Sequence, residues 1–144
     1  MLKKCITYLM WALTIFHFTS CAIIQETIST KSDADVANKL SDPHIQTFRF
    51  GDVIALKKIL NERLALYSRG LGYLKKQTGV YKGVEKVPHE KRVVKIEMDI
   101  NLLDAHLDNL LLIYPEDWDT KRDALNSKFQ SLQKNYTDAY KMLF

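Results

Sequence analysis

The chain has 144 residues, of which 47% are hydrophobic and 26% are charged, a composition typical of one globular domain and not of a disordered chain. Five Gly and three Pro are too few turn-forming residues for the many short strands of an all-β fold, so long helices are expected. The net charge of +4 becomes +2 without Lys3 and Lys4, which excludes the strong basic excess of a nucleic-acid-binding protein.

The N-terminus has the features of an export signal. Lys3 and Lys4 precede an uncharged run whose most apolar part, Ile6 to Phe18, has the length of a secretory hydrophobic region, which predicts a signal peptide over residues 1–20. The run ends in Phe18-Thr19-Ser20-Cys21, which resembles the lipobox of bacterial lipoproteins. The resemblance implies that Cys21 is lipidated and becomes the mature N-terminus. Ala22 instead of Asp after this cysteine implies the outer membrane, with the domain facing the periplasm.

Two other fates of the leader remain open. Ser20 and Ala22 form a small-x-small site, so an ordinary signal peptidase could cut after Ala22 and release a soluble secreted protein. Alternatively, the 20 uncharged residues from Cys5 to Ile24 could stay as a membrane anchor. In all three cases no cysteine follows Cys21, which excludes a disulfide or a cysteine-based metal site from the folded domain.

The segment after the leader is polar. Residues 25–46 are rich in Ser, Thr, Asp and Lys and have few apolar residues, so we expect a flexible tether over 21–47 and a folded domain over 48–144. Ser41-Asp42-Pro43 is a turn or helix-start signal that would allow a short helix over Asp33 to Leu40 or after Pro43.

Three long segments of the domain have helical periodicity. Apolar residues recur every three or four positions, which keeps one stripe of each helix facing a partner. The first helix is expected to start near Asp52 and end at Gly79, the second to start at Pro88 and reach Tyr114, and the third to follow Pro115-Glu116-Asp117. The stripes are Val53, Leu56, Leu60, Leu64, Tyr67, Leu71 and Leu74; Val93, Ile96, Ile100, Leu103, Leu107, Leu110 and Tyr114; and Trp118, Leu125, Phe129, Leu132, Tyr136, Tyr140 and Leu143.

These stripes predict an all-α fold, an antiparallel three-helix up-down-up bundle with long helices. Polar residues such as Lys121, Asp123, Asn126 and Lys134 are expected on the opposite side of the third helix. Gly70 and Gly72 inside the first helix each cost about 1 kcal/mol relative to Ala, so either a neighbour packs closely there or the helix bends.

The candidate interaction surface is an acidic flank beside the stripe of the second helix. It consists of Glu97, Asn101, Asp104 and Asp108 at helical spacing. The side chains either pair with Lys and Arg of a neighbouring helix or form a surface for a cation or a basic partner. His44, His89 and His106 form no HxxxH or HExxH pair, so no zinc site and no other cofactor is expected.

A second resemblance concerns an enzyme family. The segment from Asn61 to Arg92, with Asn61-Glu62-Arg63 on the first helix and Pro88-His89-Glu90-Lys91-Arg92 after the loop, resembles all-helical chorismate mutases. The resemblance implies that Arg63 and Lys75 clamp the substrate carboxylates and ether oxygen, with Glu90 and Arg92 completing the pocket. Such a pericyclic reaction needs cationic positioning and no nucleophile.

The leading functional prediction is a small exported, lipid-anchored envelope protein that acts as a non-enzymatic binding or accessory factor for another envelope protein. The alternatives are a periplasmic chorismate mutase-like enzyme and a helical structural oligomer. The enzyme requires Arg63 and Lys75 to converge on one pocket. The oligomer predicts a particle mass in solution that depends on protein concentration.

Overall fold

The computed structural model describes residues 31–144, and the predicted signal peptide and Cys21 lie outside them. Within the described range the chain is all-helical and has no strand, which confirms the all-α part of the predicted fold. The long helices are α2 (Val53–Thr78), α3 (Lys86–Asp108) and α4 (Trp118–Leu143), and residues 31–38 are also helical. Short 3-10 turns occupy Ile45–Thr47, Phe50–Asp52, Gly83–Glu85, Leu110–Leu112 and Pro115–Asp117.

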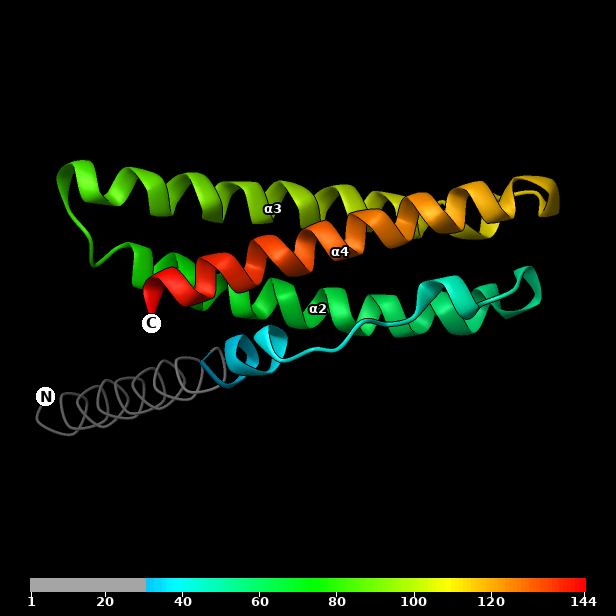
Figure 1. Ribbon diagram of the computed structural model, residues 1–144, viewed down its shortest axis with the longest axis horizontal. Coiled ribbons are helices and arrows are strands. Elements are labelled where there is room, and N and C mark those ends of the chain that lie inside the picture. The colour runs from blue at the N-terminus through cyan, green and yellow to red at the C-terminus, as the bar shows by residue number, and fades with distance from the viewer. Residues whose placement is uncertain (1–30) are drawn as a thin grey trace, which may run out of the picture.

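The three long helices lie side by side along the long axis of the molecule (Figure 1). Helix α3 packs extensively against both α2 and α4, which contact each other less. None of the helices within residues 31–144 has both the length and the apolar character needed to cross a membrane.

The core lies where the predicted stripes meet. Six of the seven stripe positions of α2 are buried, and Val53 packs against the core while partly exposed. The stripe of α3 is buried from Val93 to Leu110, but Tyr114 is 68% exposed and does not belong to it. On α4, Asn126 is buried, not solvent-facing as predicted. Spacing therefore locates the core well, except near helix ends and at small polar side chains.

The end of the second helix differs most from the predicted boundaries. Helix α3 stops at Asp108, not at Tyr114, and the chain continues as a 3-10 turn. Ile113 and Tyr114 are extended, with ψ angles of 138° and 150°. Pro115 accounts for the extended conformation of Tyr114, because a proline disfavours the α conformation of the residue before it.

The prediction of a tether is wrong over residues 31–47, which we call the N-terminal strap. Its residues 31–38 form a short helix, as the weaker sequence signal allowed, and Ala34, Ala37 and Ile45 are buried. The folded unit therefore begins at or before residue 31, not at residue 48. Small side chains explain the error, because two alanines give too weak an apolar pattern to predict burial.

Polar contacts hold the strap along α2 and α4. Asp33 pairs with Arg69 of α2 at 2.8 Å, and the Leu40 carbonyl accepts a hydrogen bond from Gln133 of α4 at 2.5 Å. The Tyr140 hydroxyl donates to the carboxylate of Asp35. That hydrogen bond, together with burial, raises the pKa of Tyr140 to about 12.

Gly70 lies where the strap crosses α2. A Cβ atom on Gly70 would overlap the hydroxyl oxygen of Tyr136 and lie 3.0 Å from the Cα of Ala34, whereas one on Gly72 would meet nothing within 4 Å. The ring of Tyr136 packs edge-on against Tyr67 with centroids 5.1 Å apart. This confirms close packing at Gly70, one of the two explanations for its place inside a helix.

Candidate functional site

The acidic flank faces α2 across an open groove. Asn101, Asp104 and Asp108 line the groove from α3, and Glu97 lies further toward the N-terminus of the same helix. Glu97 forms an ion pair with Lys75 of α2, in which Oε1 and Nζ are 2.6 Å apart. The fold therefore brings three of the four predicted residues to one place and uses the fourth to hold the two helices together.

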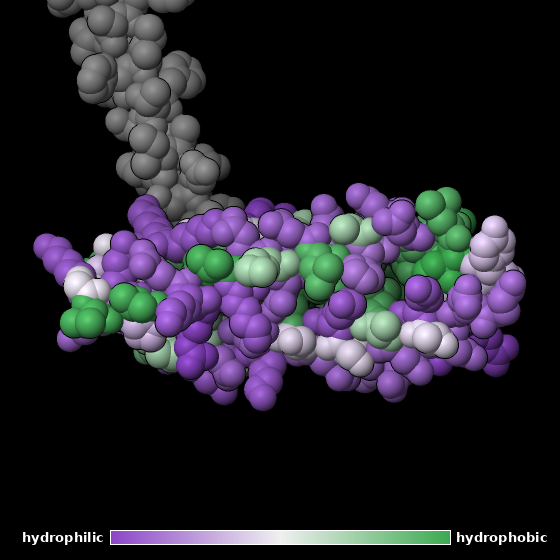
Figure 2. All heavy atoms as spheres, turned by 90° about the horizontal axis from the view of Figure 1, so that it is seen from above, coloured by the Kyte–Doolittle hydropathy of each residue, from purple (hydrophilic) through white to green (hydrophobic). Residues whose placement is uncertain are grey.

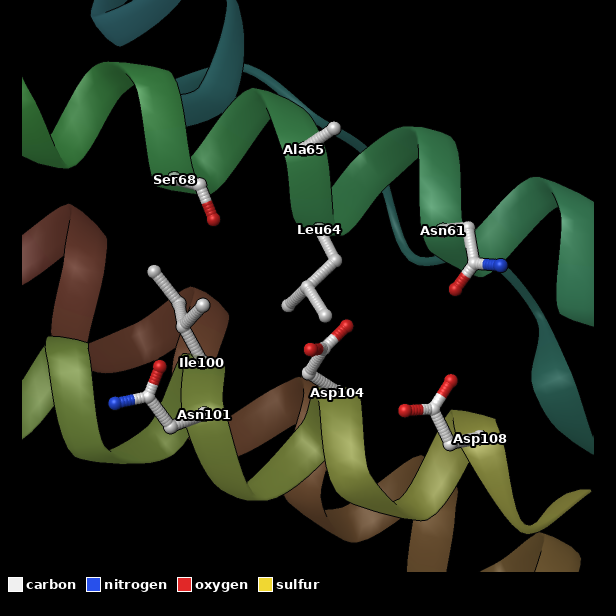
Figure 3. Close-up of a pocket in the computed structure, with 8 residues that line it drawn as sticks. All are labelled: Asn61, Leu64, Ala65, Ser68, Ile100, Asn101, Asp104 and Asp108. Atoms are coloured by element: carbon white, nitrogen blue, oxygen red, sulfur yellow. The ribbon is translucent and has the colours of Figure 1, made fainter.

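The opposite wall of the groove comes from α2. Asn61, Leu64, Ala65 and Ser68 line it, and Ile100 of α3 joins Leu64 to give the groove an apolar part. The groove has a volume of about 310 Å³ and is open to solvent along one side. Figure 3 shows the carboxylates of Asp104 and Asp108 directed toward α2, with Asn61 across from Asp108.

Two carboxylates in this groove have no cationic partner within residues 31–144. Neither Asp104 nor Asp108 forms an ion pair, and Lys57 of α2 donates to the backbone carbonyl of Asp108, not to its carboxylate, at 3.5 Å. The prediction of helix-to-helix pairing therefore holds for Glu97 only. The remaining two carboxylates are free to accept hydrogen bonds from a cation of a partner.

The residues of α2 were not identified as site residues by sequence reasoning. Asn61, Ala65 and Ser68 follow each other at spacings of four and three, which places them on one helix face. They are small or polar residues beside the buried stripe, and that signal is common on solvated helix faces. Only the position of α2 against α3 shows that this face is opposite the two carboxylates.

The structure does not bring the candidate enzyme residues together. Arg63 donates to the Ser41 carbonyl of the strap at 2.5 Å, whereas Lys75 pairs with Glu97 of α3. Glu90 pairs with Lys86 at 2.8 Å, one turn before it on the same helix, and Arg92 is exposed. Lys75 and Glu90 do share a shallow pocket of about 360 Å³, but neither Arg63 nor Arg92 lines it.

The histidines have separate surroundings. His89 stacks on Tyr81 with ring centroids 4.2 Å apart, and the Nδ1 atom of His106 lies 2.6 Å from the Leu102 carbonyl oxygen. His44 has a positive φ of 51° at the start of a 3-10 turn. Within residues 31–144 no group of three or more His, Cys, Asp or Glu side chains is arranged to hold a metal ion.

Fold and groove together define an all-helical protein of three long helices with a small acidic recess between two of them. No known family model matches this chain, and none of the curated proteins or solved structures that were compared with it is similar to it. Function has to be argued from the groove itself.

Proposed function

We propose that this protein is a non-enzymatic binding module whose α2–α3 groove accepts a lysine or arginine side chain of a partner protein. The observation that carries the proposal is the pair of carboxylates, Asp104 and Asp108, that face the groove without a cation in the described chain. Both side chains are solvent-accessible, and neither forms an ion pair within residues 31–144, so together they offer a recess with two carboxylates to a positive charge.

The shape of the groove fits a long basic side chain. Such a side chain buries its aliphatic stem on apolar surface and keeps its charged end among acceptors. Leu64 and Ile100 offer the apolar surface, and the two carboxylates offer the acceptors. Asn61 and Ser68 can accept further hydrogen bonds from the planar fork of an arginine.

The test is a titration of the full chain with a short lysine- and arginine-rich peptide. Replacing both carboxylates, Asp104→Asn with Asp108→Asn, is expected to weaken binding at least tenfold, because each charge-assisted hydrogen bond contributes about 1.5–3 kcal/mol. Calorimetry or fluorescence anisotropy at two salt concentrations measures the loss.

The matched control removes two negative charges elsewhere. Glu85 and Glu116 are exposed and lie outside the groove, so Glu85→Gln with Glu116→Gln is expected to change affinity less than threefold. Equal weakening by both double variants would mean that the peptide responds only to net charge, and it would refute the groove as the site.

We further propose that the module is tethered to the bacterial outer membrane through a lipid on Cys21, with its bundle in the periplasm. The support is the lipobox-like Phe18-Thr19-Ser20-Cys21 and Ala22. Radioactive palmitate is expected to label the wild-type chain and not Cys21→Ser. Equal labelling of both chains, or none of the wild type, would contradict the anchor.

An up-down-up arrangement of α2, α3 and α4 is part of this proposal. Figure 1 supports it, because the connections between successive helices lie at alternate ends of the molecule. In that arrangement the groove lies between antiparallel neighbours joined by the short segment 79–85, which keeps its two walls in register.

A further inference from the structure

Helix α3 has a second apolar face, opposite the one that it buries in the core. At 100° of rotation per residue, the residues of this face follow each other every three or four positions, as the residues of the core stripe do. We call it the outer seam. Its apolar members are Val87, Val94, Met98, Leu102 and Ala105, with Lys91 at the one remaining position.

Nothing in residues 31–144 covers the outer seam. Met98 at its centre is 65% exposed, and Val94 and Leu102 on either side are each about half exposed. Figure 2 views the molecule from the α3 side and shows a row of apolar patches on this face, separated by hydrophilic side chains. Apolar side chains that gather in a row on an exposed face mark an interaction site.

A helix that is apolar on two opposite faces has the pattern of a helix between two packed layers. In this molecule α3 packs on α2 and α4 with one face only. We propose that the other face packs against α3 of a second copy of this chain, with the two α3 helices parallel, and that the protein is a symmetric dimer.

Charge beside the outer seam favours a second copy as the occupant. The acidic flank, extended toward the N-terminus by Glu90, lies on one side of the seam. Arg92 and Lys95 lie on the other side, with His106 further along. Asp99 on that side already accepts a hydrogen bond from Asn135 at 2.7 Å. A partner helix must therefore present basic groups to one side and acidic groups to the other, which α3 itself does.

The same charges fix the direction of the pair. In a parallel pair the acidic side of each helix lies next to the basic side of the other, so that Glu90 lies near Lys95 of the second copy. Within one chain Glu90 pairs with Lys86 and Lys95 donates to Asn135, both at the surface, where such contacts exchange readily for a new ion pair. In an antiparallel pair like sides face each other, and Glu90 would approach Asp104 of the second copy. Lys91 in the seam can bury its aliphatic chain in the interface while its ammonium group stays in solvent. A single polar position of this kind also sets the axial register of the two helices.

Cysteine cross-linking of the full chain tests the interface and its direction. The background carries Cys5→Ser and Cys21→Ser, which removes both native thiols and any lipid on Cys21. In a parallel pair Leu102 of one copy lies beside Leu102 of the other, so Leu102→Cys is expected to give at least tenfold more disulfide-linked dimer on mild oxidation than Lys128→Cys, a partly exposed site on α4.

Two other outcomes would overturn the proposal. In an antiparallel pair centred on Met98, position 102 meets position 94, so a mixture of Leu102→Cys and Val94→Cys chains would cross-link while Leu102→Cys alone would not. If the seam binds a different protein or a lipid surface, Leu102→Cys would cross-link no better than Lys128→Cys.

A charge swap gives an independent measurement in solution. Glu90→Lys is expected to weaken dimerisation at least threefold, and adding Lys95→Glu is expected to restore it, as followed by analytical ultracentrifugation in mild detergent. Since neither residue lines the α2–α3 groove, peptide binding there is expected to be unchanged. A monomeric wild type across micromolar concentrations, or no rescue by the second substitution, would contradict the parallel dimer.

Discussion

Replacing Leu103 with Ala is expected to lower the free energy of unfolding by about 2–5 kcal/mol, the range for removing a buried Leu side chain. Leu103 is 1% exposed, and it lies on the buried face of α3, the helix that packs on both other long helices. The empty volume would therefore be lined by side chains of the shared core, which cannot collapse without moving a whole helix. Urea unfolding followed by circular dichroism measures the change.

Ile54→Ala is the comparison for this variant. Ile54 is also a branched aliphatic residue within a long helix, but it is 74% exposed. Its replacement is expected to change stability by less than about 0.5 kcal/mol. If Leu103→Ala unfolds at the same urea concentration as Ile54→Ala, the assignment of Leu103 to the shared core is wrong.

Gly70→Ala is expected to destabilise the protein by about 1–3 kcal/mol, although alanine is the better helix former. The added methyl group would overlap the Tyr136 hydroxyl oxygen and press on the backbone of Ala34. Tyr136 is fully buried and its ring packs edge-on against Tyr67, so its hydroxyl group cannot move aside without disturbing the core. The strain is expected to lift the strap, which hydrogen exchange would detect as faster exchange over residues 31–47.

Gly72→Ala provides a control with the opposite sign. It lies two residues away on the same helix, and a Cβ atom there would meet nothing within 4 Å. Alanine is expected to raise stability by about 0.5–1 kcal/mol at this position, because it lowers the entropy of the unfolded chain. Stabilisation by both substitutions would show that the strap does not pack on Gly70.

The long helices were predictable because their signals are local. Gly79 lies directly after α2, and the Pro115-Glu116-Asp117 turn lies directly before α4. Three- and four-residue spacing located nearly the whole core, since burial requires one continuous face. The outer seam was not predicted, because spacing alone does not show which of two apolar faces of one helix stays exposed.

The strap was not predictable in the same way. Its buried residues are chiefly two alanines, and the contact of Ala34 depends on Gly70, which is more than thirty positions away in the sequence. A small residue that permits close approach has no periodic signature of its own. The match between a short alanine face and a glycine on another helix arises only in the packed molecule.

The sequence by itself determined the helical class, the three long helices, most of their buried faces and the row of carboxylates on α3. The tertiary structure decided which of those carboxylates are neutralised. Glu97 meets Lys75, whereas Asp104 and Asp108 line the groove and form no ion pair within residues 31–144. The physical reason is that side-chain pairing across two helices depends on their rotation and axial register, which are set by the packing of the whole core and not by any local pattern.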